Sequence, residues 1–396
     1  MTRGQEVSAW ALLLLLGLLL GGGLVEAGVR VLHLVPDRFW EPDAKLGWRH
    51  SAGRTGWWTQ EDREFLVPIS ISRQGLRDVE HAYAKPAGVT RVLLLGDSFI
   101  EALQVPLAAT VARRLEAHLG ATTEVINAGV SGYGTASELL FLRDQGLRYA
   151  PDVVLLAFYP GNDVKNNSAT LEDILPPVYD GGGKLERVTA PLEGFARART
   201  GWRDHVQAYR YTRQLLLRHP ELTAPLRRLG VAASLDAPRA ARERDGVPVD
   251  YWVYAPEPSA EWEDAWRRTE SLLAAVRATA ISAGSRFAIA VIPSRYQIYP
   301  ELWAETLAAH PAMQGRAWEL AGPTRRLLRW CETQGVPCLD LAAGLVAAVK
   351  TSAPLYFHHD GHWTAAGHET VAQQLKNFLR ERQLVSVQEA ETHELH

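Results

Sequence analysis

The 396-residue sequence is poor in sulfur and has no surplus of one charge. It contains two cysteines and two methionines, and its 45 acidic residues stand against 42 lysines and arginines, a formal charge of -3. A near-neutral chain lacks the strongly basic surface that nucleic-acid binding requires, so we expect no nucleic-acid partner. There is no metal-like cysteine pattern, and we expect neither a metal ion nor an organic cofactor.

The two cysteines, Cys331 and Cys338, flank a short segment, WCETQGVPC, that joins a predicted helix to a predicted strand. A disulfide could close this loop if the protein resides in an oxidising compartment. Two unpaired thiols are an equally good interpretation of the sequence.

Only one long hydrophobic run occurs, the 19 uncharged residues from Val7 to Val25. A helix of this length can just span a bilayer, and the run is long for a signal peptide. Residues 1–33 are therefore predicted to be a transmembrane anchor with the remaining chain outside the cytoplasm, either periplasmic or extracellular. The alternative is a signal segment cleaved near Val25–Ala27, which would leave a secreted protein.

Strand-like and helix-like segments alternate from residue 91 onward. Short apolar runs at 92–95, 124–127 and 153–158, and later SRFAIAVIPS and VPCLDLA, are typical of buried parallel strands. This alternation predicts an α/β fold, a three-layer α/β/α sandwich with a central parallel sheet. Within it, one helix is predicted from Val105 to Gly120, and Thr135 and Glu138 are predicted to form a capping box that opens the next helix.

Four regions follow from this pattern. After the anchor, residues 34–90 are predicted to be a β-rich leader packed on the main domain, which covers 91–384. An Arg-rich, Ala-rich insertion at about 168–250 interrupts that domain, and it is expected to be a partly helical segment that could act as a lid. Its basic residues could touch anionic lipid headgroups or an acidic polymer, although a solvated helical face is the preferred interpretation. Residues 385–396 are predicted to be a flexible tail.

Polar motifs follow the predicted strands at the points where the strands end. The first strand leads into Gly96-Asp97-Ser98, the second into Asn127-Ala-Gly129-Val-Ser131-Gly132, and the third into Pro160-Gly161-Asn162-Asp163. A further motif, His358-His359-Asp360-Gly361-His362-Trp363, precedes the last helix. Ligands bind outside the carboxyl ends of parallel strands, so these motifs are expected to meet there.

Their side chains suit acyl transfer. A serine needs a histidine to remove its proton, and a carboxylate beside the histidine fixes its tautomer. The tetrahedral intermediate needs neutral hydrogen-bond donors, such as a glycine N–H or an asparagine amide. Gly129 is better interpreted as a turn glycine, and His368, inside the last helix, as a structural residue.

The blocks GDSF, NAGVSGYG, PGND and DGHW, in this order, resemble the SGNH (GDSL-type) hydrolase family, whose fold is flavodoxin-like. The resemblance covers about 91–380 apart from the insertion. It implies that Ser98 is the nucleophile, His362 the base and Asp360 its partner, and that the Ser98 N–H, the Gly132 N–H and the Asn162 side chain form the oxyanion hole. Asp97 and Asp163 would support these loops.

One spacing departs from the usual family pattern. Asp360 lies two residues before His362, whereas three is common, and DGHW is similar to the DxHW pattern of proteins that O-acetylate bacterial exopolysaccharides. His358 or His359 thus stays open as an alternative base. The resemblance implies a serine esterase that cleaves O-acyl groups, plausibly acetyl on a polysaccharide or another small ester. The alternatives are an O-acyltransferase that uses the same acyl-serine, and a non-catalytic glycan-binding protein.

Overall fold

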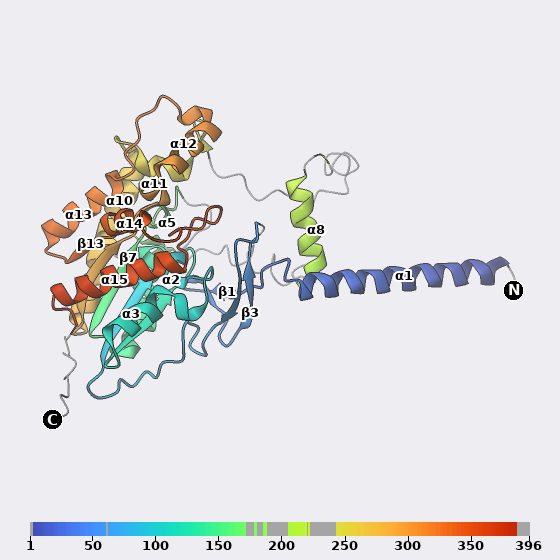
Figure 1. Ribbon diagram of the computed structural model, residues 1–396, viewed down its shortest axis with the longest axis horizontal. Coiled ribbons are helices and arrows are strands. Elements are labelled where there is room, and N and C mark those ends of the chain that lie inside the picture. The colour runs from blue at the N-terminus through green and yellow to red at the C-terminus, as the bar shows by residue number, and fades with distance from the viewer. Residues whose placement is uncertain are drawn as a thin grey trace.

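The structure is a computed structural model. It describes residues 3–60, 62–171, 178–179, 185–187, 205–219, 221 and 243–385. A long N-terminal helix, α1 (Arg3–Val31), projects from a body in which helices surround a sheet (Figure 1). The predicted lid falls on the insertion, most of which lies outside the described residues, as do residues 386–396 of the predicted tail.

The central sheet has five parallel strands, β5 (Thr90–Gly96), β6 (Thr123–Gly129), β7 (Val153–Phe158), β12 (Arg286–Val291) and β13 (Cys338–Asp340). Their order across the sheet is β13-β12-β7-β5-β6. The chain moves outward from β5 to β6 and then returns to the other side of β5, so the winding direction reverses between β5 and β7. The predicted α/β fold with a central parallel sheet is confirmed.

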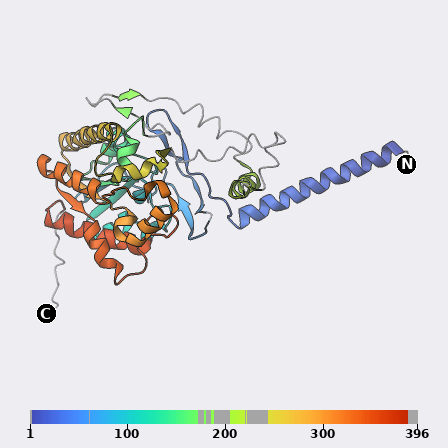
Figure 2. The same cartoon turned by 90° about the horizontal axis from the view of Figure 1, so that it is seen from above.

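Side chains alternate between the two faces of the sheet, as strand geometry requires. In β5, Leu93 and Leu95 join one hydrophobic core, whereas Val92 and Leu94 join the other. Three helices cover the first core: α4 (Thr135–Asp144), α10 (Ala260–Ser282) and α13 (Gly322–Gln334). Three cover the second: α3 (Val111–Leu119), α14 (Ala342–Val349) and α15 (Ala365–Glu381). Figure 2 shows the helices around the sheet.

Two antiparallel hairpins precede the sheet. They consist of β1 (Trp40–Asp43) with β2 (Gly47–His50), and β3 (Thr55–Thr59) with β4 (Leu66–Ser70). Their inward residues form a small core with Leu103 of the α/β body. Burial of this shared core fixes the hairpins against the loop that follows α2 (Ser98–Glu101).

Shorter elements complete the described fold. The helices are α5 (Asp163–Asn166), α8 (Gln207–Arg218), α11 (Arg295–Ile298) and α12 (Pro300–Ala309), and the short strands are β8 (Val178–Tyr179), β9 (Leu185–Arg187), β10 (Glu243–Arg244) and β11 (Val247–Pro248). The 3-10 turns are η1 (Leu107–Ala109), η2 (Gly146–Tyr149), η3 (Val249–Tyr254) and η4 (Pro311–Met313).

Two local predictions are wrong. The helix predicted from Val105 to Gly120 is divided, because the 3-10 turn η1 ends at Thr110 and this residue caps α3 by accepting a hydrogen bond from the Arg113 N–H. The predicted capping box does not form, since Gly134 occupies the N-cap of α4 and Glu138 points into the interior. In both places, packing against the sheet overrides the local pattern.

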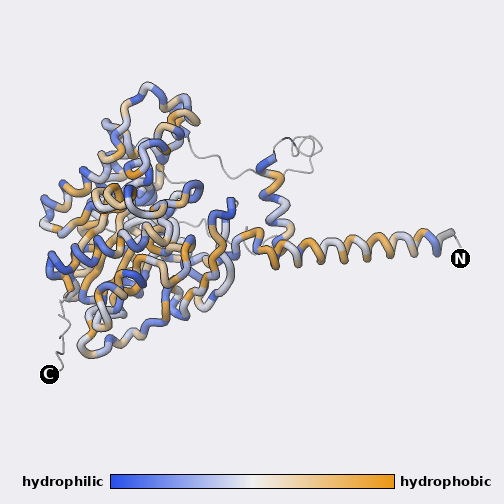
Figure 3. The backbone as a smooth tube through the Cα atoms, viewed as in Figure 1, coloured by the Kyte–Doolittle hydropathy of each residue, from blue (hydrophilic) through white to orange (hydrophobic). Residues whose placement is uncertain are grey.

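Helix α1 is the apolar element outside the body. Residues Gln5–Val31 are long and apolar enough to cross a membrane by length and composition, and only 6% of their most apolar window is buried (Figure 3).

The two cysteines form a bond. Cys331 of α13 and Cys338 of β13 are joined by a disulfide. The structure thus selects the disulfide over two unpaired thiols.

Candidate active site

The predicted site residues gather at the carboxyl edge of the sheet. Ser98 begins α2 directly after β5, Gly132 lies in the loop after β6, Asn162 follows β7, and His362 precedes α15. The winding direction reverses between β5 and β7, and such a switch point leaves a crevice where open α/β sheets bind ligands. The sheet order therefore places Ser98 and Asn162 on the two sides of this crevice.

Three side chains form a hydrogen-bonded chain across the site. His362 Nε2 lies 2.7 Å from Ser98 Oγ, and His362 Nδ1 lies 2.6 Å from Asp360 Oδ1. Asp360 Oδ1 also accepts a hydrogen bond from the His362 backbone N–H at 3.1 Å. The two-residue spacing therefore permits the contact, because Gly361 between them adopts a φ of +82°, which lets the loop turn back.

Within these three hydrogen-bonded side chains, the charges of Asp360 and His362 stabilise each other. Burial lowers the pKa of His362, but the hydrogen bond and the negative charge of Asp360 outweigh it, and the net pKa lies above its ordinary value. Burial alone would raise the pKa of Asp360, yet the hydrogen bond from His362 and its positive charge bring it below the ordinary value. An imidazole held this way is a stronger base towards the Ser98 hydroxyl.

Close packing explains why the serine stands where it does. A side chain at Gly129 would collide with the Ile100–Glu101 backbone, and one at Gly96 would collide with Ile100, so the two glycines let α2 rest directly on the strands. Asp97 caps α2 by accepting a hydrogen bond from the Phe99 N–H at 2.9 Å. Asp97 and Phe99 are buried while Ser98 is half-buried, so the hydroxyl is presented to solvent.

Donors surround the space in front of Ser98. Within the described part of the chain, neither the Ser98 N–H nor the Gly132 N–H donates to a protein acceptor. Gly132 has a φ of +78°, and a side chain there would collide with Trp48, so only glycine fits the loop. Asn162 donates from Nδ2 to Asp97 Oδ2 at 2.9 Å, which fixes its amide beside Ser98 and leaves its second N–H for a ligand.

The other histidines lie elsewhere. His358 and His359 contact each other ring to ring, and their backbone N–H groups donate to the Glu64 carboxylate, whereas His362 is the histidine whose ring contacts Ser98. His368 is buried, its Nδ1 accepts a hydrogen bond from the Val111 N–H, and burial lowers its pKa to about 3. The geometry thus favours His362 over the alternatives and gives His368 a structural position.

Sequence reasoning missed the contribution of the leader hairpins. The Glu64 carboxylate accepts hydrogen bonds from the backbone N–H groups of His358, His359 and Asp360 at 2.8–3.0 Å. Trp48 Nε1 donates to the Ser131 carbonyl at 2.8 Å, next to Gly132. Segments up to 296 residues apart in sequence therefore hold the two loops of the site. No periodicity or motif marks these two leader residues.

Glu101 is a second missed residue. Its buried carboxylate accepts hydrogen bonds from Trp40 Nε1 at 2.8 Å and from Ser131 Oγ, and it lies 2.5 Å from His50 Nε2. Gln104, from the same turn of chain, hydrogen-bonds to Asp360. The residues after Ser98 thus connect the leader to both loops of the site.

Further carboxyl groups lie beneath Asp97. Asp163 is fully buried and accepts a hydrogen bond from the Tyr159 N–H at 2.7 Å, which supports the loop that carries Asn162. Burial and the nearby charge of Asp97 raise the pKa of Glu138 well above its ordinary range, and neither Glu138 oxygen has a hydrogen-bond partner in the described structure. Burial and the nearby charges of Asp97 and Glu138 also raise the pKa of Asp163 well above its ordinary range.

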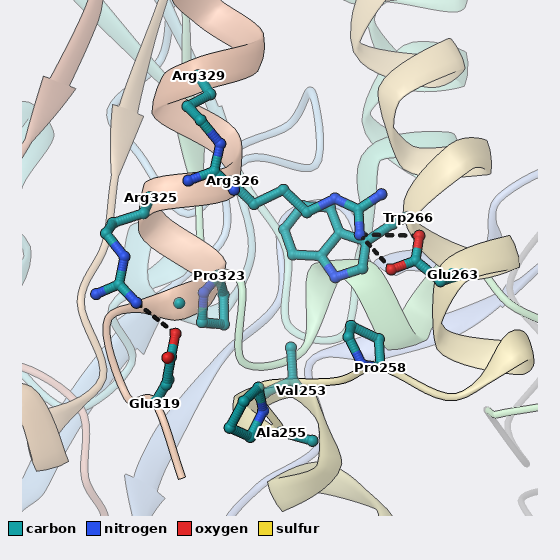
Figure 4. Close-up of a pocket in the computed structure, with 12 residues that line it drawn as sticks. Val253, Ala255, Pro258, Glu263, Trp266, Glu319, Pro323, Arg325, Arg326 and Arg329 are labelled. Atoms are coloured by element: carbon teal, nitrogen blue, oxygen red, sulfur yellow. Dashed lines mark hydrogen bonds and ion pairs between the residues drawn. The ribbon is translucent and has the colours of Figure 1, made fainter.

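A polar pocket between α10 and α13 is separate from this arrangement. Figure 4 shows Arg326 paired with Glu263 through two hydrogen bonds of 2.9 and 3.0 Å, and Arg325 paired with Glu319. The Arg326 guanidinium also lies 4.8 Å from the centre of the Trp266 ring. None of the predicted site residues lines this pocket, and two of its arginines are neutralised by its own carboxylates.

Parts of the chain are similar to known proteins. Residues 248–396, which include Asp360 and His362 but not Ser98, match the family of the SGNH hydrolase-like domain of acetyltransferase AlgX. The chain is 30% identical over 181 residues to "Probable alginate O-acetylase AlgJ" of Pseudomonas aeruginosa, an alignment covering 43% of this chain and 42% of the relative. The match thus spans less than half the length of that relative.

Two solved structures are also similar. The acetylxylan esterase Axe2 of Geobacillus stearothermophilus is 12% identical, with a TM-score of 0.36 over 75% of this chain and 96% of that chain. A lipolytic protein of the G-D-S-L family from Veillonella parvula is 11% identical, with a TM-score of 0.37 over 73% and 97%. Residues 248–396 thus match the family of the SGNH hydrolase-like domain of acetyltransferase AlgX, and part of the chain is similar to a probable alginate O-acetylase.

Proposed function

We propose that this protein transfers O-acetyl groups to hydroxyls of a polysaccharide through an acyl-enzyme on Ser98. The observation that carries the proposal is the chain of hydrogen bonds from Asp360 through His362 to Ser98, set among unoccupied backbone donors. A hydroxyl, an imidazole and a carboxylate in this order form the apparatus of nucleophilic acyl transfer.

In the first half-reaction, Ser98 Oγ attacks the carbonyl carbon of the acetyl donor while His362 Nε2 takes the hydroxyl proton. The negative oxygen of the tetrahedral intermediate faces the N–H groups of Ser98 and Gly132 and the Asn162 amide. His362 then gives its proton to the departing oxygen, and acetyl-Ser98 remains. One donor of this kind typically contributes about 2.7–4 kcal/mol of barrier lowering.

In the second half-reaction, a sugar hydroxyl gives its proton to His362 and attacks acetyl-Ser98, which returns the serine hydroxyl and leaves the sugar acetylated. The match to acetyltransferase AlgX and the similarity to an alginate O-acetylase support a sugar as the acceptor. Hydrolysis, as in an esterase acting on acylated carbohydrate, is the second candidate. It is favoured by the exposure of the His362 side chain, 23%, which gives water a route to the acyl-serine.

A competition between the two acceptors tests this. The purified protein is incubated with p-nitrophenyl acetate as donor and alginate oligosaccharides as acceptor, with Ser98→Ala as control. We expect acetylated oligosaccharide by mass spectrometry, in excess of free acetate, and neither product from Ser98→Ala. Free acetate released at a rate unaffected by the oligosaccharide would instead support the esterase. Failure of a serine-directed phosphonate to label Ser98 would exclude both.

We further propose that α1 is an uncleaved anchor and that the α/β body stands outside the cytoplasm. The length and apolarity of Gln5–Val31 support a membrane span. The Cys331–Cys338 disulfide supports an oxidising compartment, because cytosolic thiols are kept reduced. N-terminal sequencing of the membrane fraction tests this, since a chain that begins near Glu26 would instead be secreted after cleavage.

A further inference from the structure

Helix α8 lies across the end of the N-terminal helix. In Figure 1, α8 stands crosswise to α1 at the end nearest the body, and Figure 2 shows α8 end-on while α1 is still seen lengthwise. The two views together place α8 transverse to α1. If α1 crosses a membrane, as proposed above, α8 therefore runs along the membrane surface.

Hydrogen bonds fix the start of α8 to one level of α1. The Glu26 carboxylate accepts from the backbone N–H groups of Gln207 at 3.1 Å and Ala208 at 2.7 Å, which are donors that a helix leaves unsatisfied in its first turn. Arg30 donates to Glu26 at 2.6 Å and to the His205 carbonyl at 2.7 Å. The first turn of α8 thus rests on the turn of α1 that begins at Glu26.

That level coincides with the edge of the hydrocarbon layer. The uncharged run ends at Val25, and its 19 residues extend over about 28 Å as a helix, close to the roughly 30 Å of a bilayer core. Glu26 is the first charged residue after the run, so it falls at the boundary between acyl chains and headgroups. A transverse helix that starts there occupies the headgroup layer.

One face of α8 is bound to the leader. Gln207 Nε2 donates to Asp37 Oδ1 at 3.2 Å, and Arg210 Nη2 donates to the Pro36 carbonyl at 2.7 Å. These contacts turn the Gln207–Arg210 side of the helix towards the body. They also connect α8 to the segment that leads into the hairpins around the active site.

The opposite face has the composition of an interfacial helix. With 3.6 residues per turn, Tyr209, Thr212 and Leu216 lie opposite Gln207, and Arg213 lies beside them. Tyrosine and leucine with flanking arginines are typical of helices that lie in the plane of a membrane surface. Thr212 on this face is exposed in the structure.

We propose that α8 is a membrane-surface helix that lies in the phospholipid headgroup layer, with Tyr209, Thr212 and Leu216 towards the bilayer. The inference rests on the membrane anchoring proposed for α1 but not on the acyl chemistry. Since α8 is bound both to α1 and to the leader, it would hold the body at a set height and orientation above the membrane.

Depth measurements on the full-length chain test this. Both native cysteines are in a disulfide, so a single cysteine introduced by Thr212→Cys can carry an environment-sensitive NBD label. The protein is reconstituted into phosphatidylcholine vesicles that contain nitroxide lipids as quenchers. We expect the label to shift to the blue and to be quenched most by nitroxides near the headgroups.

Three matched labels make the result decisive. A label at Gln214→Cys, on the body-facing side of α8, and one at the exposed Arg73→Cys should be quenched little, whereas one at Leu18→Cys should be quenched by deep nitroxides. A Thr212 label that behaves like the Arg73 label, while the Leu18 label is quenched, would overturn the inference and leave the anchor intact. An unquenched Leu18 label would overturn the anchor and the inference together, without bearing on transfer to oligosaccharides.

Discussion

The imidazole Nε2 of His50 lies 2.5 Å from the carboxylate of Glu101, and both side chains are buried. His50 belongs to the hairpins before the α/β body, whereas Glu101 ends the short helix that begins at Ser98. The same carboxylate binds Ser131 in the loop of Gly132. The leader is thus hydrogen-bonded directly to the site. Three of the predictions below concern these hydrogen bonds and the site residues that they position.

Replacing Trp48 with phenylalanine removes the hydrogen bond to the Ser131 carbonyl and keeps an aromatic ring. We expect kcat for acyl transfer to fall about 2–10-fold with little change in KM, because a hydrogen bond contributes about 0.5–1.5 kcal/mol and here it positions the Gly132 N–H for the transition state. Trp58→Phe is the matched control, since Trp58 Nε1 has no partner in the described structure. Equal kcat values for the two variants would contradict this role for Trp48.

Replacing Glu64 with alanine leaves the backbone N–H groups of His358, His359 and Asp360 without their acceptor. Hydrogen bonds to a charged group contribute about 1.5–3 kcal/mol, so we expect a lower free energy of unfolding in urea and a kcat reduced about tenfold. The exposed neighbour Asp62→Ala serves as control. If Glu64→Ala retained full kcat, the leader would not hold this loop in the active arrangement.

Asp360→Asn is expected to reduce kcat by roughly 10³–10⁴-fold, because an amide no longer stabilises the imidazolium or the correct tautomer of His362. It should also move the acidic limb of the pH–kcat/KM profile. His362 acts as a base only when neutral, and Asp360 raises its pKa. Without the carboxylate this pKa falls, so activity should persist to lower pH than in the parent protein. A limb shifted to higher pH would show that Asp360 does not set the pKa of His362.

Glu138→Gln should stabilise the fold relative to the parent protein, and this stabilisation should grow as the pH rises. The folded-state pKa of Glu138 is raised, so the folded protein keeps the carboxyl proton where the unfolded chain releases it, and stability falls as the pH rises from the unfolded-state pKa towards the folded-state pKa. Glutamine has nothing to ionise. In urea unfolding from about pH 5 to about pH 9, the gain in unfolding free energy of Glu138→Gln over the parent should grow with pH. A gain that shrinks with pH would mean that Glu138 is charged in the folded protein.

Removal of the disulfide should lower stability without changing the chemistry. For the short loop closed by Cys331 and Cys338, the chain-entropy model gives about 2–3 kcal/mol. We expect Cys331→Ser/Cys338→Ser to unfold at lower urea concentration while kcat stays unchanged, since Cys338 begins β13 at the amino edge of the sheet and Ser98 follows β5 at the carboxyl edge. The parent protein treated with a reductant provides the control. If the free energy of unfolding were the same with and without reductant, the bond would not stabilise the fold.

The amino-acid sequence by itself determined the α/β alternation, the strands that bear GDS and GND, and the apolar N-terminal helix. Strands buried on both faces appear as short unbroken apolar runs, and a membrane span needs a long one, so burial leaves a mark on local sequence. The order of the blocks also pointed to Ser98, Gly132, Asn162, Asp360 and His362 before any coordinates were considered.

Only the tertiary structure decided which groups meet. The reversal between β5 and β7 brings Ser98 to Asn162, and the fold selects His362 over His358 as the partner of Ser98. Glu64, His50 and Glu101 carry no local signal, and the capping-box pattern at Glu138 was misleading. A hydrogen bond between residues hundreds of positions apart depends on how whole elements pack, and local patterns of burial and turn formation carry no record of that packing.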